Sequence, residues 1–216
     1  MVPMYNPGHF DESDPAALRD AIRRLGAGEL ITFGSEGLEA SVVPLLVSED
    51  VTTITGQLAR ANHQWKRVDR TVPALVTWRG PGAYISPSYY PSKWEHGKVV
   101  PTWNYITVQA RGTLVLHEDA AWKRLHVGSL TDWHEAVFGA PWSVDDAPSD
   151  FIDGMIKAIV GIEVKVLSLE GKWKLSQNRP DPDIVGAISG LRDRGPMGDE
   201  ARVADAMEQR IGRSGA

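Results

Sequence analysis

The feature that most constrains this chain is a series of short β-type segments separated by tight turns. Three of them, Glu29–Phe33, Glu39–Val47 and Val51–Leu58, follow one another with only a few residues between them. Connections this short join antiparallel neighbours, because a parallel pair needs a crossover of roughly a dozen residues or more. The turn at Gly34–Gly37 therefore predicts a β-hairpin, and the third segment extends it to a meander.

More β segments follow along the chain. Two short ones, Pro73–Trp78 and Ala83–Ser86, flank glycines at Gly80–Gly82, and a long one covers Val99–His117. Gly161–Ser176 alternates in part between apolar and polar residues, which is typical of a strand with one buried face. Six or seven strands in this order predict a mainly β, α+β fold, an antiparallel β-barrel with peripheral helices.

Helical patterns occur at the start, in one insert and near the end. Asp14 can cap a helix that begins at Pro15 and stops at Gly26. The other expected helices are Arg60–Asp69, Asp119–Leu130, Thr131–Phe138 and Pro148–Ile159. We therefore expect one domain over residues 1–190 with a helical insert at about 119–159. Residues 191–216 are expected to form a tail with a helix over 200–211 and disordered final residues.

Composition narrows the classes of function. The 216 residues carry a formal net charge of −5, which argues against direct DNA binding, and they include no cysteine, which excludes disulfides and cysteine nucleophiles. None of the six histidines has zinc-ligand spacing, so no metal site is expected. No apolar run is long enough to span a membrane, and no signal peptide is evident, so the expected location is cytoplasmic.

Three segments combine the groups that a charged, planar ligand needs. At 60–66 a strand gives way to a polar helix, an arrangement suited to phosphate. At 86–93 and 100–105 prolines, tyrosines and a tryptophan alternate with hydrogen-bonding side chains, as in a ring-binding pocket. At 170–179 three cations, an indole and two amides lie together and suit an anion or a subunit interface. Each segment also has a structural explanation that needs no ligand. The first can be a solvated helix start, the second a corner of the aromatic core with a surface loop, and the third a solvated strand end.

Taken in order, these segments resemble the PaiB family of FMN-binding negative transcriptional regulators. The matching motifs are MYNPGHF at 4–10, GQLARANHQW at 56–65, GPGAYISPSYYPSK at 80–93, GKVVPTWNY at 97–105, PWSVDDAP at 141–148 and AIVGIEVKVLSLEGKWKLSQNR at 158–179. The resemblance spans roughly residues 4–190. It implies a split β-barrel of the pyridoxamine-phosphate-oxidase and flavin-reductase-like kind, and a homodimer with FMN at the subunit interface.

The resemblance also implies roles for individual side chains. The candidates for the flavin phosphate are Arg60, Asn62, Gln64 and Lys66. Those for the ring or the ribityl chain are Ser86, Ser88, Lys93, Thr102, Trp103 and Asn104. Those expected from the partner subunit are Lys172, Trp173, Gln177 and Arg179.

Three positions depart from the family pattern, because Val43, Gln57 and Gln109 stand where histidine is common. The loss of three imidazoles makes the pocket less able to ligate haem or to titrate near neutral pH. FMN binding is therefore the favoured function. No residue stands out as a catalytic acid or base, so an FMN-dependent oxidoreductase activity is left open. The alternatives are an indirect transcriptional regulator without catalysis and a haem-binding or haem-degrading split barrel.

Overall fold

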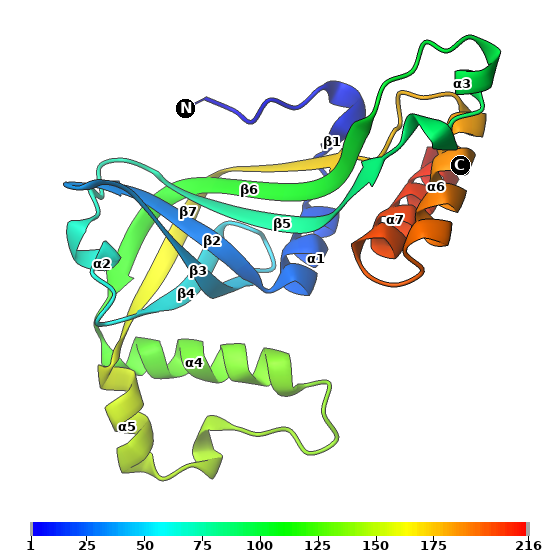
Figure 1. The fold of residues 1–216 in the computed structure, drawn as a ribbon. Coiled ribbons are helices and arrows are strands. Elements are labelled where there is room, and N and C mark those ends of the chain that lie inside the picture. Colours follow the sequence, from blue (N-terminus) through cyan, green and yellow to red (C-terminus); the bar gives the residue numbers. More distant parts are fainter. Residues whose placement is uncertain (1, 215–216) are drawn as a thin grey trace. The chain divides into compact units, whose positions relative to one another are not determined.

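The computed structural model describes residues 2–214 and contains one seven-stranded sheet (Figure 1). Its strands are β1 (Asp11–Glu12), β2 (Ala27–Gly34), β3 (Gly37–Val47), β4 (Thr53–Ala59), β5 (Ala74–Ile85), β6 (Thr102–His117) and β7 (Ile159–Lys174). They are ordered β1-β7-β4-β3-β2-β5-β6, and β6 also pairs with β7. This last pairing closes six strands into a ring, which confirms the predicted antiparallel split barrel and leaves those strands without a free edge.

The helices are α1 (Pro15–Leu25), α2 (Gln64–Arg67), α3 (Ser92–Glu95), α4 (Ala120–Glu135), α5 (Ser149–Lys157), α6 (Asp181–Arg194) and α7 (Asp199–Ser214). Single 3-10 turns occur at Gly8–Phe10, Pro87–Tyr89 and Val144–Asp146. Within residues 2–214 no helix has both the length and the apolar character needed to cross a membrane.

The chain forms two compact units, each assembled from separate stretches of sequence. The first unit comprises Met1–Asp14, Arg79–Val108 and Glu170–Ala216, and the second comprises Pro15–Trp78 and Gln109–Leu169. Strands β5, β6 and β7 each run from one unit into the other. The predicted organisation, one domain over 1–190 followed by a tail, stays a prediction.

The second unit contains the meander that the turn residues predict. In the β2–β3 hairpin Gly34 lies opposite Gly37, and in the next pair Leu45 lies opposite Gly56 of β4. Alternate residues of β2 are buried, which gives the sheet an apolar inner face and a solvent face. The helix α1 begins at Pro15 and is followed by Gly26 with a φ of +68°, so the predicted start and stop are both confirmed.

Two predicted interruptions are wrong. The segment from Ala74 to Ile85 is a single strand, because β2 pairs with residues 75–77 and β6, its other neighbour, lies alongside the glycines, where a Cβ on Gly80 would meet Ile106. Likewise α4 is one helix from Ala120 to Glu135, since nothing near Thr131 breaks the hydrogen-bond ladder.

The first unit contains a helix that the sequence analysis missed. The expected helices do not include α6, which contains Gly186 and Gly190, and both glycines are positions of close approach. A Cβ on Gly186 would lie 2.1 Å from the carbonyl oxygen of Tyr89, and one on Gly190 would lie 2.3 Å from the Tyr89 ring. Spaced four residues apart, both glycines lie on one face of the helix and let Tyr89 pack against it.

Helices α6 and α7 lie side by side in the first unit (Figure 1). Their buried side chains, among them Ile184, Leu191 and Met207, form one apolar cluster with Ile85 and Leu175. The helix α7 covers the segment for which a helix over 200–211 was predicted. The disorder expected for the final residues falls on positions outside the described part of the chain.

Candidate functional site

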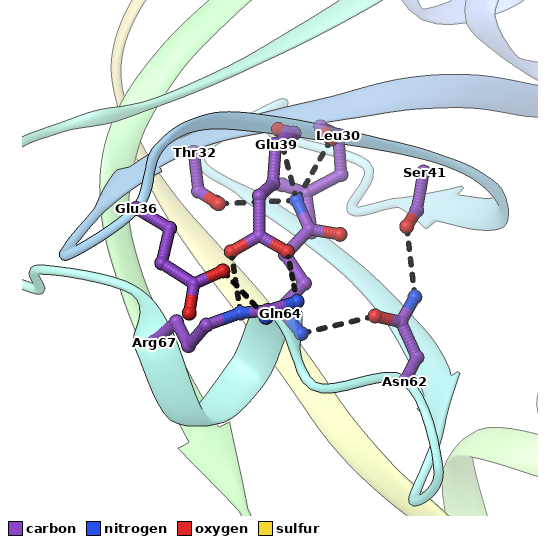
Figure 2. A network of polar contacts seen from close by, with 8 residues as sticks. All are labelled: Leu30, Thr32, Glu36, Glu39, Ser41, Asn62, Gln64 and Arg67. Atoms are coloured by element: carbon purple, nitrogen blue, oxygen red, sulfur yellow. Dashed lines mark hydrogen bonds and ion pairs between the residues drawn. The ribbon is translucent and has the colours of Figure 1, made fainter.

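The segment between β4 and α2 is anchored to the β2–β3 hairpin by the side chain of Gln64 (Figure 2). Only 1% of this residue is exposed. The two N–H groups of its Nε2 are shared among three acceptors, the carbonyl oxygen of Leu30 at 3.1 Å, Thr32 Oγ1 at 3.1 Å and the carbonyl oxygen of Glu39 at 3.2 Å. The amide therefore has a structural role, holding the segment that carries the predicted phosphate ligands.

Asn62 and Arg67 complete this network (Figure 2). Asn62 Nδ2 donates to Ser41 Oγ at 2.8 Å, and its Oδ1 accepts from the Gln64 backbone N–H at 3.0 Å. Arg67 makes a bidentate pair with Glu39, at 3.0 and 2.8 Å, and a further bond to Glu36 at 2.8 Å. Two carboxylates thus neutralise Arg67, and this part of the junction offers no unbalanced positive charge to a phosphate.

Arg60 is directed to the end of α5. Its Nε donates to the carbonyl oxygen of Lys157 at 2.8 Å and one Nη to that of Ile159 at 3.1 Å. The other Nη pairs with Glu118 at 2.9 Å. The guanidinium therefore satisfies carbonyl groups at the negative end of a helix, a position that favours a cation.

The four predicted phosphate residues accordingly do not converge on one point. Gln64 is buried, Asn62 bonds Ser41, Arg60 caps α5, and the exposed Lys66 lies over the Trp65 ring, 5.2 Å from its centroid. The sequence analysis missed a lysine near Arg60. Lys123 shares the buried face of α4 with His126, and a lysine at an otherwise core-facing position was the available signal.

In the first unit, two neighbouring residues of the predicted ring-binding set contact Lys174, which the sequence analysis did not single out. Lys174 Nζ donates to Thr102 Oγ1 at 2.5 Å and to the carbonyl oxygen of Trp103 at 2.7 Å. Its ammonium lies 5.8 Å from the Tyr105 ring centroid, and that of Lys172 lies 5.7 Å from the same ring. Burial, reinforced by the charge of Lys172, lowers the pKa of Lys174.

The contacts of Lys174 leave the Trp103 indole accessible to a ligand. Trp103 is 53% exposed, and Tyr84 meets it edge to face with ring centroids 6.2 Å apart. An exposed indole on the strand whose Tyr105 ring lies near two ammonium groups suits a flat ligand that carries negative charge.

The loop residues of the predicted set have local contacts. Ser86 caps the 3-10 turn by accepting from the Ser88 backbone N–H at 3.2 Å, and the two hydroxyls lie 2.7 Å apart. Lys93 places its ammonium over the neighbouring Trp94 ring, 4.6 Å from the centroid. These three residues therefore stabilise the loop itself.

Two of the remaining candidates, Asn104 and Gln177, hold the end of β7 in place. Asn104 is fully buried and its Nδ2 donates to Ser176 Oγ at 2.9 Å, where the backbone of Ser176 has a φ of +67°. Gln177 accepts from the Leu175 N–H at 2.7 Å and donates to the carbonyl oxygen of Trp173 at 2.5 Å. The Arg179 guanidinium lies over the Tyr90 ring at 5.1 Å. Structural contacts thus account for the polar groups of Asn104 and Gln177.

Gln57, which stands where the family commonly has histidine, is hydrogen-bonded in the second unit. His126 Nε2 lies 2.6 Å from Gln57 Oε1, so the neutral ring donates to the amide oxygen. The Trp122 ring stacks on the rings of both His126 and His117, and His117 Nε2 lies 2.8 Å from a carboxylate oxygen of Glu163. Burial lowers the pKa of His126 to about 4.

The other two residues that stand where histidine is common, Val43 and Gln109, have different surroundings. Val43 is buried in the core, and Gln109 accepts from Arg111 at 3.1 Å. Within the described residues no three His, Asp or Glu side chains gather as they would around a metal ion.

The closed ring of six antiparallel strands defines the class of the protein as a split barrel. Two solved structures share this fold at low sequence identity. The flavocytochrome Anf3 from Azotobacter vinelandii matches with a TM-score of 0.55 at 12% identity over 84% of this chain and 73% of its own. The FAD and heme binding protein from Mycobacterium smegmatis matches with a TM-score of 0.53 at 11% identity over 81% and 78%.

The chain belongs to the family described as "Putative FMN-binding domain", which it matches over residues 4–168. It is also 28% identical over 211 residues to the protease synthase and sporulation protein PAI 2 of Bacillus subtilis (strain 168), covering 96% of this chain and 98% of that protein. The resemblance to the PaiB family is therefore confirmed. FMN as the cofactor of the family is confirmed with it.

Proposed function

We propose that this chain binds FMN and works as a flavin-binding split barrel of the PaiB type. The observation that carries the proposal is the family match over residues 4–168, which includes the β4–α2 junction and the whole of β6. FMN, when bound, supplies one- and two-electron redox chemistry, while the protein supplies binding and electrostatics.

Because several predicted residues are engaged in structural contacts, fewer side chains are available to contact FMN than the sequence predicts. In the first unit, Trp103 offers an exposed ring face, and Thr102 and Lys174 offer polar groups beside it. An ammonium next to a stacked flavin ring favours added negative charge on that ring, so Lys174 is suited to orient and polarise it. We therefore place the ring contacts on Thr102, Trp103 and Lys174. The full set of fourteen residues stays a prediction.

A homodimer is part of this proposal. The solvent face of the β2–β3 hairpin carries apolar side chains, with Leu38 75% and Val42 71% exposed and Phe33 also exposed. Apolar groups that gather on one strand face are typical of a protein interface. Light scattering of the purified chain measures the mass directly: a monomer at working concentrations would contradict this part of the proposal.

Absorption spectroscopy and an FMN titration test the cofactor. We expect a flavin spectrum, or saturable binding of one FMN per subunit at roughly micromolar affinity or tighter. The Trp103→Ala variant should bind FMN about tenfold more weakly, since base–aromatic stacking is worth about 1–3 kcal/mol. Trp94→Ala, which removes another exposed tryptophan, is the matched control and should bind as the wild type does.

A protein that neither contains nor binds flavin would overturn the proposal. A Soret band instead of a flavin band would favour the haem-binding alternative. If FMN binds, its reduction by nicotinamide donors decides whether the protein is an oxidoreductase. Transcriptional regulation and a cytoplasmic location stay predictions from the sequence.

A further inference from the structure

All of the excess negative charge of the chain lies in one segment of the second unit, residues 131–156. We call this segment the acidic insert; it contains the end of α4, the loop after it and all but the last residue of α5 (Figure 1). It has six carboxylates and no lysine or arginine. The other 190 residues carry 22 acidic and 23 basic side chains, so the rest of the chain is close to neutral.

Most carboxylates of the acidic insert have no counter-ion. Asp145 and Asp153 share one cation, Arg124, at 3.1 and 3.7 Å. Four others form no ion pair with any residue in the described part of the chain: Asp132, Glu135, Asp146 and Asp150. The carbonyl groups at the end of α4 add partial negative charge at the same place. The insert therefore presents a negative surface that a cationic partner would neutralise.

Large apolar side chains are exposed on the same segment. Directly after α4, Val137 is 82% and Phe138 60% exposed, and Trp142 is 44% exposed. Glu135 holds this stretch against the helix end, because its carbonyl oxygen accepts from the Phe138 N–H at 2.9 Å and its carboxylate accepts from the Trp142 N–H at 3.0 Å. Val137, Phe138 and Trp142 are therefore named the helix-end cluster.

A second exposed apolar pair lies on α5. Phe151 and Met155, 56% and 50% exposed, are four residues apart and so share one side of the helix. Ile152 and Ile156 of the same helix are buried together with Val144. The insert thus has a small apolar core of its own, and the exposed pair lies outside that core.

Exposed apolar groups beside unpaired carboxylates fit a partner with an apolar face flanked by cations. Nucleic acids and anionic membranes carry the same sign of charge as the insert, so both are disfavoured. A second copy that used the same surface would also bring its six carboxylates against these six, and like charges opposed across an interface are costly. Charge complementarity therefore favours a basic partner.

We propose that the acidic insert is a docking surface for a basic amphipathic segment of another protein. The helix-end cluster, with Phe151 and Met155, contacts the apolar face of that segment, and the unpaired carboxylates contact its lysine or arginine side chains. The proposal is independent of FMN binding, since none of these residues is among the predicted flavin ligands.

The test measures the binding of fluorescently labelled synthetic peptides to the full chain by anisotropy. The lysine peptide has about 16 residues, enough for four helical turns, with leucine on one helical face and lysine elsewhere. The glutamate peptide replaces every lysine with glutamate. We expect the lysine peptide to bind with a Kd of about 100 μM or tighter, at least about tenfold more tightly than the glutamate peptide, and more weakly as salt is raised.

Two double variants assign the binding to the insert. Phe138→Ser with Trp142→Ser removes most of the helix-end cluster and leaves the core around Val144 in place, so it should fold and bind the lysine peptide about tenfold more weakly. Asp132→Asn with Asp150→Asn keeps the shape of both side chains and should reduce the salt dependence. Leu167→Ser replaces a 58% exposed leucine of β7, outside the insert, and is the matched control that should bind as the wild type does.

Three results would overturn the proposal. The wild type could fail to bind the lysine peptide, or bind the two peptides equally. The variant without Phe138 and Trp142 could bind the lysine peptide as tightly as the wild type and Leu167→Ser do. Light scattering could show that this variant alone has lost mass relative to the wild type, which would assign the surface to a second copy of the chain.

Discussion

The buried imidazole of His126 should make the stability of this protein depend on pH between about 6.5 and 4. The ring packs against Trp122 and donates to Gln57, and burial lowers its pKa from 6.5 to about 4. In the unfolded chain the same ring takes up a proton near pH 6.5. Between these two pH values the unfolded state binds more protons, so the free energy of unfolding falls as the pH falls.

The magnitude follows from the two pKa values. Folding favours the neutral ring by about 3 kcal/mol, and this contribution is complete above about pH 6.5 and lost by about pH 4. That loss is a large fraction of the roughly 5–15 kcal/mol that holds a domain folded. Hydrogen bonds from Ser48 and Thr52 lower the pKa of Asp50 to about 2, so this carboxyl changes stability only at more acid pH.

Urea denaturation followed by tryptophan fluorescence, at intervals from about pH 7 to pH 4.5, measures this effect. His126→Gln removes the titrating ring and keeps an N–H donor for Gln57. We expect the variant to be less stable than the wild type near pH 7, and to lose much less stability on acidification. His96→Gln, which replaces an exposed histidine, is the control and should follow the wild type.

Parallel curves for the wild type and His126→Gln across this range would refute the reasoning. They would mean that water or a local opening solvates the ring in the folded state. A wild type that becomes more stable on acidification would contradict the sign of the effect.

Three further predictions concern stability, each measured by equilibrium unfolding. In Gly161→Ala the new Cβ would lie 2.2 Å from the Trp122 ring, so α4 must shift and the free energy of unfolding should fall by about 1–3 kcal/mol. Val51 has a φ of +53°, which disfavours a β-branched residue, so Val51→Asn should raise that free energy by about 1 kcal/mol. Gln64→Ala removes the buried amide that bonds the β2–β3 hairpin and should lower it by about 2–3 kcal/mol.

One result would contradict each of these three stability predictions. An unchanged Gly161→Ala protein would show that the contact with Trp122 relaxes without cost. A destabilised Val51→Asn protein would show that the valine side chain contributes more by packing than its backbone costs. A fully stable Gln64→Ala protein would show that water replaces the amide in the network.

Much of the barrel was predictable because its signals are local. The Gly34–Gly37 turn and the alternation of β2 lie within a few residues of each other, so they predict the hairpin directly. The start of α1 at Pro15 and its stop at Gly26 are likewise set by the conformational preferences of single residues.

Errors arose where a distant partner overrides a local signal. Strand β5 continues through glycines because the neighbouring strand β6 holds it extended. Helix α6 tolerates Gly186 and Gly190 because Tyr89, almost a hundred residues earlier in the sequence, packs on them. Glycine marks a turn only when nothing else compensates for its conformational freedom.

The sequence by itself therefore determined the fold class, the meander from β2 to β4 and the family with its flavin cofactor, since these depend on local patterns and ordered motifs. Only the tertiary structure decided what each candidate side chain touches. Gln64 and Asn104 are buried structural amides. Arg60 bonds a carbonyl group at the end of α5, and Lys123 of α4 lines the same cavity as Arg60, although sequence spacing could not relate the two residues. A residue type indicates which bonds a side chain can make, but its partners are selected by contacts between segments far apart in the chain.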